Sequence, residues 1–279
     1  MVTPVLKWAG GKRGLTSDIL GLFPPDYRRR AYHEPFVGGG AVFFQVRPRA
    51  GTINDINPRL INFYRVVRDS PEELIAQARQ YPYDEETYYR LRERFNQKGL
   101  PPVEEAALFL YLNKTAYNGL YRVNSKGEFN VPFGRHRNPR IVPEAGIRAA
   151  SKALRRVEIF NRDFSYVVDF AGEGDLCYLD PPYQPVSPTA NFTEYSEGGF
   201  DMDQQERLRD VCVELHEKGV LFVLSNSDVE AIRELYGGEG FRVVVVKGRR
   251  SIGSKAHTRG SVNELLITNI PPGNSPPSP

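Results

Sequence analysis

The chain has 279 residues, enough for one large α/β domain or for such a domain with a smaller insertion, and 40% of them are hydrophobic. Its formal net charge of +3 is compatible with a nucleic-acid partner if the basic residues gather on one surface. No apolar run is long enough for a signal peptide or a bilayer-spanning helix, so we exclude a membrane partner and expect a cytoplasmic protein.

The N-terminal part of the chain predicts a βαβ unit. Short apolar runs at 32–34 and 52–55 flank a glycine-rich turn at 38–40 and a short helix. The dipeptide at 57–58 (Asn-Pro) then supplies an N-cap and a proline for the first helical turn, which predicts that another helix begins there.

The middle of the chain changes in composition from about residue 69. Three charge-rich helical segments precede an Asn-, Gly- and Arg-rich stretch with hairpin character at 118–134. The helical segments lie at 71–80, 85–98 and 103–114. We interpret residues 66–150 as an inserted second domain.

The α/β pattern returns in the last third of the chain. Strand candidates lie at 157–160, 176–179, 220–224, 241–246 and 264–270. The last two follow each other without a helix, so we expect an α/β fold whose mostly parallel sheet has an antiparallel last strand.

The domain division follows from these elements. Residues 1–65 and 151–271 should form one α/β domain around the insertion. Residues 272–279 are rich in Pro and Ser, which predicts a disordered tail.

The two cysteines argue against metal chemistry. Cys177 and Cys212 lie in apolar stretches without the spacing of a Cys-x-x-Cys or His/Cys ligand set. We expect two buried, reduced thiols and no metal site.

A glycine-rich turn and a carboxylate predict a nucleotide-type site. Residues 34–40 (Glu-Pro-Phe-Val-Gly-Gly-Gly) join a strand to a helix, where glycine lets backbone and ligand approach closely. Asp55 ends the next strand, where a carboxylate can accept hydrogen bonds from ribose hydroxyls. The spacing fits neither the NAD fingerprint nor an ATP-binding loop, and a plain tight turn has nearly equal weight.

Residues 7–12 (Lys-Trp-Ala-Gly-Gly-Lys) hold the single tryptophan of the chain. They can form a lid in which Trp8 packs on a cofactor and Lys12 donates to the carboxylate of a methionine moiety. An ordinary N-terminal turn with a core tryptophan explains the pattern equally well.

The most specific motif is 180–183 (Asp-Pro-Pro-Tyr), which directly follows a buried strand. An adenine N6 amine is a poor nucleophile because its lone pair is delocalised into the ring. Asp180 and the carbonyl of Pro181 can accept its two N–H bonds and turn the lone pair toward a sulfonium methyl. Pro182 stiffens the turn and Tyr183 can stack on the base, which must flip out of the duplex.

Two other base-modifying chemistries are excluded by what the motifs lack. Cytosine C5 methylation needs a cysteine nucleophile on a loop, and zinc deaminases need His-x-Glu with Pro-Cys-x-x-Cys. Neither pattern occurs in the chain, which leaves chemistry at an exocyclic amine.

Almost the whole chain resembles the Dam family of adenine-N6 DNA methyltransferases. The motifs at 7–12, 34–40, 55–57 (Asp-Ile-Asn) and 180–183 occur in the family's order, and the segments at 109–113, 117–134 and 189–193 match as well. The resemblance implies a Rossmann-like S-adenosylmethionine-dependent methyltransferase fold and a target-recognition domain inserted at 66–150. It also implies double-stranded DNA as partner, and GATC as the target word.

The resemblance assigns site residues by position. It implies that S-adenosyl-L-methionine contacts Trp8, Lys12, Phe36, Gly38, Asp55, Asp163, Phe164 and Asp180. The candidate DNA-binding residues are Lys7, Tyr117, Asn118, Leu120, Arg122, Asn124, Lys126, Asn130, Pro132, Arg135 and His136. Arg122 is expected to contact a guanine, whereas His136 departs from the Tyr of the family and leaves its base contacts in doubt.

Charge supports a nucleic-acid partner for the hairpin. Residues 111–142 hold six basic side chains against one acid, and a second basic cluster lies at 247–259. The alternatives are an enzyme that methylates an amino group of cytosine N4, RNA or a protein glutamine, and a DNA-binding module without activity. The basic hairpin opposes a protein substrate, and the complete set of Lys12, Asp55 and Asp180 opposes an inactive module. We expect a monomer; whether it stands alone, belongs to a phage or accompanies a restriction nuclease is not encoded in these motifs.

Overall fold

The computed structural model describes residues 3–183, 200–249 and 261–272. The motif at 189–193, most of the basic cluster at 247–259 and most of the tail at 272–279 lie outside these ranges. The described residues contain one sheet of seven strands in the order β3-β2-β1-β4-β5-β7-β6. The strands are β1 Tyr32–Glu34, β2 Gly51–Asn54, β3 Glu158–Phe160, β4 Leu176–Leu179, β5 Leu221–Ser227, β6 Arg242–Arg249 and β7 Ser261–Thr268.

The sheet confirms the predicted mixture of parallel and antiparallel strands. Strands β3, β2, β1, β4 and β5 are parallel neighbours, with Tyr32 opposite Leu176 in the β1–β4 pair. Strand β7 runs antiparallel to both β5 and β6. Because parallel strands end at the same edge, the residues after β1, β2 and β4 meet at the carboxyl edge of the sheet.

Alternation along the strands divides the core between the two faces of the sheet. Leu176 and Tyr178 of β4 belong to one cluster of buried residues, and Cys177 and Leu179 belong to the other. Helices α8 Val167–Phe170, α9 Met202–Glu217 and α10 Glu230–Gly237 cover the second face. Cys177 and Cys212 are both buried there as free thiols, as predicted.

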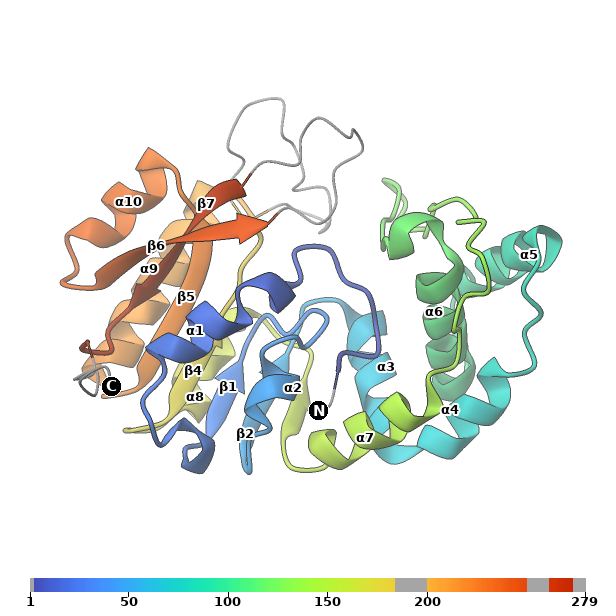
Figure 1. The fold of residues 1–279 in the computed structure, drawn as a ribbon, viewed down its shortest axis with the longest axis horizontal. Helices are drawn as coiled ribbons and strands as arrows, with labels where there is room; N and C mark the ends of the chain where they lie inside the picture. Colours follow the sequence, from blue (N-terminus) through green and yellow to red (C-terminus); the bar gives the residue numbers. More distant parts are fainter. Residues whose placement is uncertain (1–2, 184–199, 250–260, 273–279) are drawn as a thin grey trace, which may run out of the picture.

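The first face is covered by helices that continue into a separate helical group (Figure 1). These helices are α1 Thr16–Leu22, α2 Phe43–Val46, α3 Pro58–Asp69, α4 Pro71–Ala78, α5 Glu85–Phe95, α6 Pro102–Thr115 and α7 Glu144–Leu154. The Asn57 side chain caps α3 by accepting from the N–H groups of Arg59 and Leu60, as the Asn-Pro pair predicted. Short 3₁₀ turns lie at Lys12–Gly14, Tyr27–Arg29, Tyr117–Gly119 and Phe164–Tyr166.

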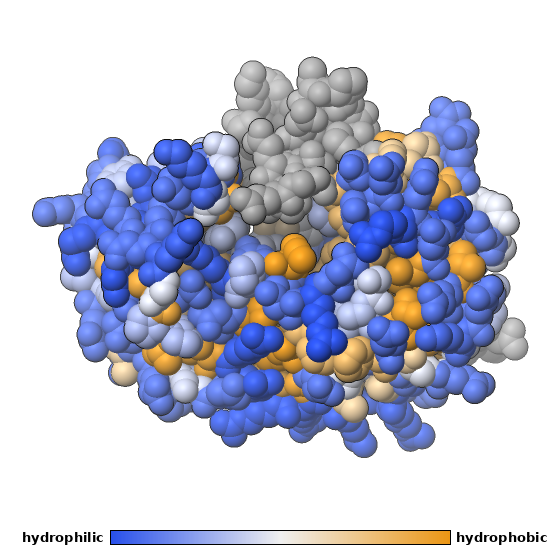
Figure 2. Space-filling model, turned by 180° about the vertical axis from the view of Figure 1, so that it is seen from behind, coloured by the Kyte–Doolittle hydropathy of each residue, from blue (hydrophilic) through white to orange (hydrophobic). Residues whose placement is uncertain are grey.

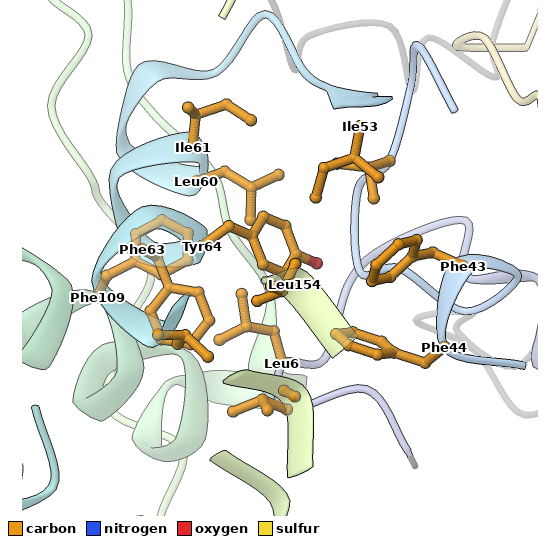
Figure 3. Packing of buried hydrophobic residues seen from close by; sticks show 14 of the residues in the cluster. Leu6, Phe43, Phe44, Ile53, Leu60, Ile61, Phe63, Tyr64, Phe109 and Leu154 are labelled. Atoms are coloured by element: carbon orange, nitrogen blue, oxygen red, sulfur yellow. The ribbon is translucent and has the colours of Figure 1, made fainter. Parts of the chain in front are cut away.

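Helix α6 is central to the helical group. All residues from Ala106 to Asn113 are buried, so the helix is enclosed on every side rather than amphipathic. Phe109 of α6 joins Phe63 and Tyr64 of α3 and Leu6 of the N-terminal segment in one cluster (Figure 3). The hydrophobic core therefore continues from the sheet into the helical group.

The predicted hairpin forms at residues 116–134. Antiparallel bridges join Ala116 to Phe133 and Val123 to Phe129, and the turn closes through a bond from Asn124 N–H to Glu128 O of 2.9 Å. The Asn96 side chain exchanges two hydrogen bonds with the backbone of Phe129. Helix α5 ends at Phe95, three residues before the predicted end, and the side chain of the next residue, Asn96, ties this end of the helix to the hairpin.

Hydrophilic residues predominate on the face seen from behind, and apolar residues show between them near its centre and lower edge (Figure 2). No helix in the described ranges is long and apolar enough to cross a membrane.

Candidate active site

Three loops at the carboxyl edge of the sheet bring the predicted cofactor and catalytic residues together. The glycine turn follows β1, Asp55 follows β2, and Asp180 follows β4. The 7–12 segment approaches the same edge, since Lys12 Nζ lies 2.8 Å from Asp180 Oδ1. Strand order thus places side chains from distant parts of the sequence around one site.

Asp55 is fixed through both of its carboxylate oxygens. Gly38 N–H donates to Oδ2 at 3.0 Å and Asn57 N–H donates to Oδ1 at 3.0 Å. Burial raises the pKa of Asp55 to about 6, although these backbone N–H groups favour the charged form. Gly38 has a φ of 47°, a left-handed conformation that suits glycine, and its carbonyl accepts from Tyr64 at 2.7 Å.

Asp180 lies beside a buried ammonium. Lys12 Nζ donates to Gly10 O at 2.8 Å and lies 4.4 Å above the Tyr183 ring, besides forming the ion pair with Asp180. Burial raises the pKa of Asp180 to about 6; Lys12 opposes this shift and Glu264 adds to it. Within the described residues, the partner of the buried Asp180 Oδ1 is the Lys12 ammonium. This oxygen can accept an N–H group from a ligand once Lys12 turns to another anion.

Buried partners hold the 180–183 loop in place. Tyr183 donates to Glu264 Oε2 of β7 at 2.6 Å. Gln205 Nε2 donates to the carbonyl of Pro182 at 3.2 Å, and the buried Asn226 donates to Gln205 Oε1 at 2.9 Å. Sequence reasoning missed these three supports. Glu264, the single acid in the apolar run of β7, carried a signal in the sequence, whereas Gln205 and Asn226 carried none.

An aromatic cluster surrounds Phe36, which lies in the glycine-rich turn after β1. The Phe36 ring lies 5.3 Å from that of Phe164 and 5.8 Å from that of Phe200. Asp163 accepts from Ser165 N–H at 3.1 Å and pairs with Arg207 at 3.1 Å. The structure thus brings the predicted residues Phe36, Asp163 and Phe164 together.

Trp8 lies between the glycine turn and the helical group. Its ring stacks on Tyr121 at 5.5 Å and on Phe109 at 6.2 Å. A methyl group built on Gly38 would lie 2.8 Å from Trp8 Cδ1, so the ring closes directly over the turn. Glycine is therefore required at position 38 for steric reasons as well as for its φ.

The candidate DNA-binding residues fall into an exposed and a half-buried set. Exposed are Lys7, Tyr117, Asn118, Arg122, Lys126, Pro132 and Arg135. Half-buried are Leu120, Asn124, Asn130 and His136. The exposed set supplies most of the charge, which suits contacts to phosphate and to base edges.

Several of these residues also hold the hairpin. Arg122 Nε donates to Asn130 Oδ1 at 2.7 Å, which fixes the guanidinium across the two strands. Asn124 Oδ1 accepts from the N–H groups of Lys126 and Glu128, so this side chain forms the turn. His136 Nε2 lies 2.9 Å from Ala116 O, a contact to the backbone at the base of the hairpin.

No group of metal-ligating side chains occurs among the residues that the structure describes.

Comparisons with known proteins identify the family of the chain. Residues 8–252 match the model of the D12 class N6 adenine-specific DNA methyltransferase family. A type II methyltransferase of Lactococcus lactis subsp. cremoris is 41% identical, over 95% of this chain and 95% of its own length. A type II methyltransferase of Methanocaldococcus jannaschii is 40% identical over 96% and 99%, and the DNA adenine methylase of Escherichia coli K12 is 40% identical over 94% and 93%.

Proposed function

The chain belongs to the D12 class N6 adenine-specific DNA methyltransferases, and we propose that it methylates adenine in GATC within duplex DNA after flipping the base out of the helix. Its sheet, mostly parallel with β7 antiparallel, is a Rossmann-like methyltransferase fold. We further propose that it acts as a monomer and that residues 66–150 form its target-recognition domain.

One observation carries the assignment of the chemistry. Asp180 Oδ1 is buried at the end of β4, and within the described residues its partner is the Lys12 ammonium at 2.8 Å, which can turn to the cofactor carboxylate and free this oxygen. An adenine N6 amine placed there would donate one N–H to Asp180 and the other to the carbonyl of Pro181. Both bonds favour pyramidal nitrogen, which frees its lone pair for attack. Tyr183, held by Glu264, offers a ring face on which the flipped base can stack.

The residues around this acceptor fit S-adenosylmethionine, the methyl donor that the family implies. Asp55 has both oxygens aligned by backbone N–H groups and can accept from two ribose hydroxyls. Phe36 and Phe164 offer apolar ring surface to an adenine, and Asp163 offers a carboxylate to its amine. Lys12 can exchange its ion pair with Asp180 for the cofactor carboxylate. When bound, the cofactor supplies an activated methyl on sulfur.

Recognition is assigned to the 116–134 hairpin. Arg122 is exposed and its Nε donates to Asn130, so its terminal guanidinium nitrogens can meet the O6 and N7 acceptors of guanine in the major groove. Lys126 is exposed at the turn and is assigned to phosphate. We propose that Lys7, Tyr117, Asn118, Leu120 and Pro132 line the path of the target.

A methyl-transfer assay tests this function. The protein is incubated with methyl-labelled S-adenosylmethionine and duplexes that differ only in one GATC site, and the modified nucleoside is identified after digestion. We expect label in N6-methyladenine from the GATC duplex alone. Label on cytosine or on RNA, or equal label on both duplexes, would contradict the proposal.

A further inference from the structure

We propose that Tyr121 is a positioning residue that couples the 116–134 hairpin to Asp55, the carboxylate assigned to the cofactor ribose. The inference rests on the proposed function, because that function places Asp55 at the cofactor and the hairpin on DNA. Tyr121 directly precedes Arg122, yet the two side chains differ in environment: Arg122 is exposed and Tyr121 is half-buried.

Aromatic rings surround Tyr121 on three sides. Its ring stacks on Trp8 with an interplanar angle of 22°, lies 5.4 Å from the Phe109 ring of α6, and lies 5.7 Å from the Phe129 ring of the facing hairpin strand. The side chain therefore moves with the hairpin but is packed against residues outside it. A shift of Arg122 toward a guanine must be accommodated at these rings.

The first connection to Asp55 runs through Trp8. Trp8 closes over Gly38 and Gly39, where an added methyl group would lie 2.8 Å and 2.9 Å from its nearest atoms. Gly38 N–H in turn donates to Asp55 Oδ2 at 3.0 Å. A tilt of the Trp8 ring thus changes the position of the donor that holds one oxygen of the carboxylate.

The second connection runs through Asn57. Burial raises the pKa of the Tyr121 hydroxyl, and the nearby polar side chain of Asn57 opposes that shift. Asn57 N–H donates to Asp55 Oδ1 at 3.0 Å, while its side chain caps α3. Tyr121 therefore stacks on Trp8, which covers the Gly38 donor, and lies near Asn57, which supplies the other donor to Asp55.

This arrangement predicts mutual dependence of DNA and cofactor binding. If the hairpin settles on its target word, Tyr121 fixes both donors and presents Asp55 in one orientation. By linkage, the cognate duplex then raises the affinity for cofactor by the same factor by which cofactor raises the affinity for the duplex. A tyrosine that merely fills the core would contribute to stability without contributing to this factor.

The coupling is measured by calorimetric titration with S-adenosylhomocysteine. It is the ratio of the dissociation constant without DNA to the dissociation constant with a saturating GATC duplex. For the unaltered protein we expect a ratio in the range of roughly 5 to 150. Tyr121→Leu, which removes the ring, should bring the ratio close to one. Tyr121→Phe, which removes only the hydroxyl, should lower it about two- to threefold, in keeping with the loss of one modest hydrogen bond. The matched control is Tyr81→Phe, which removes a hydroxyl that accepts from Gln77 in the helical group, and it should keep the full ratio.

Trp8, the single tryptophan, provides a second readout. Its emission should change when the GATC duplex binds the unaltered protein or Tyr81→Phe, and the change should be reduced in Tyr121→Phe. Thermal unfolding identifies a Tyr121→Leu variant that fails to fold, in which case Tyr121→Phe decides. A ratio near one for the unaltered protein, or the full ratio in a folded Tyr121→Phe, overturns the inference. Failure to bind S-adenosylhomocysteine or to distinguish GATC in the unaltered protein would instead overturn the proposed function.

Discussion

At the carboxyl edge of the sheet, polar groups are held by buried partners: Asp55 receives two backbone N–H groups, and Asp180 lies 2.8 Å from the buried ammonium of Lys12. In the 116–134 hairpin, Arg122 and Lys126 are exposed, and Arg122 is held by one cross-strand side chain. Groups that act on reacting atoms benefit from being fixed before the ligand arrives. Groups that meet DNA must instead stay accessible and exchange their partners on binding. Variants at the two regions should therefore fail in different ways.

The largest effect is expected at the carboxyl edge. Asp180→Ala removes the acceptor of one N–H bond of the amine, and we expect methyl transfer to fall by at least about 10²–10³-fold, as for loss of a preorganised electrostatic partner. DNA binding should persist, because the carboxylate does not face the phosphates in the proposed complex. Single-turnover transfer and a gel-shift titration measure the two quantities separately. Near-normal turnover of the Ala variant would exclude the proposed mechanism.

A smaller loss, confined to ligand binding, is expected at the cofactor side of the same edge. Asp55→Ala should weaken binding of S-adenosylhomocysteine by roughly 10- to 100-fold, since hydrogen bonds to a charged group contribute about 1.5–3 kcal/mol. Trp8→Ala should weaken it as well, because the ring surface that packs on the ligand is lost. Calorimetric titration checks this, with thermal unfolding to show that the fold is intact. Unchanged affinity in both folded variants would mean that the cofactor has been placed wrongly.

Much of the carboxyl edge was predictable from the sequence because its motifs directly follow strands. The short apolar runs before Asp55 and Asp180 predicted strands that end at Asn54 and Leu179, and parallel strands must bring their ends together. The supports from Gln205 and Asn226 were not predictable, since they depend on which helix and strand pack behind the loop. Helix α7 was missed, although its buried residues Ile147, Ala150, Ser151 and Leu154 have helical spacing.

The hairpin was predicted as an element, but its connections were not. The turn at Lys126 and Gly127 follows from local chemistry, with Asn124 accepting from two backbone N–H groups. The stacking of Tyr121 on Trp8 joins residues more than one hundred positions apart, and no local pattern encodes it. The same holds for Asn113, which exchanges hydrogen bonds with the backbone of Lys7 and ties the N-terminal segment to α6.

At the hairpin, variants should change specificity rather than chemistry. Arg122→Ala should cost about 1–3 kcal/mol of discrimination against the wrong base, because a bidentate contact to guanine is lost. GATC should be methylated less well, and sites altered at the first or last base pair nearly as well as before. Relative turnover on single-substitution duplexes measures this.

Lys126→Ala is the matched control for Arg122→Ala, since both remove one exposed positive charge from the hairpin. It should lower turnover evenly on all sites and reduce the slope of log affinity against log salt by about one. A uniform loss for Arg122→Ala as well would assign that residue to phosphate and erase its distinction from Lys126.

A further effect is the pH dependence of the carboxyl edge, where burial raises the pKa of Asp180 from 3.8 to about 6. Transfer needs the carboxylate as acceptor, so the rate should fall as the pH decreases through about 6, approaching tenfold per pH unit below it. The contribution of Asp180 to folding stability changes in the opposite direction and becomes more favourable as the pH falls. The folded protein binds this proton more tightly than the unfolded chain, so the cost of the buried charge is present above pH 6 and disappears as the pH falls toward 3.8.

Asp180→Asn separates the contribution of Asp180 to the pH dependence of stability from that of the other carboxylates, because an amide carries no charge at any pH. A shift of about two pKa units corresponds to about 3 kcal/mol, so the free energy of unfolding of Asp180→Asn should exceed that of the unaltered protein by up to this amount near pH 7. The two free energies should converge by pH 4. Chemical denaturation across this range tests it. A constant stability difference would show that Asp180 titrates normally, and that the edge of the sheet is less desolvated than its geometry indicates.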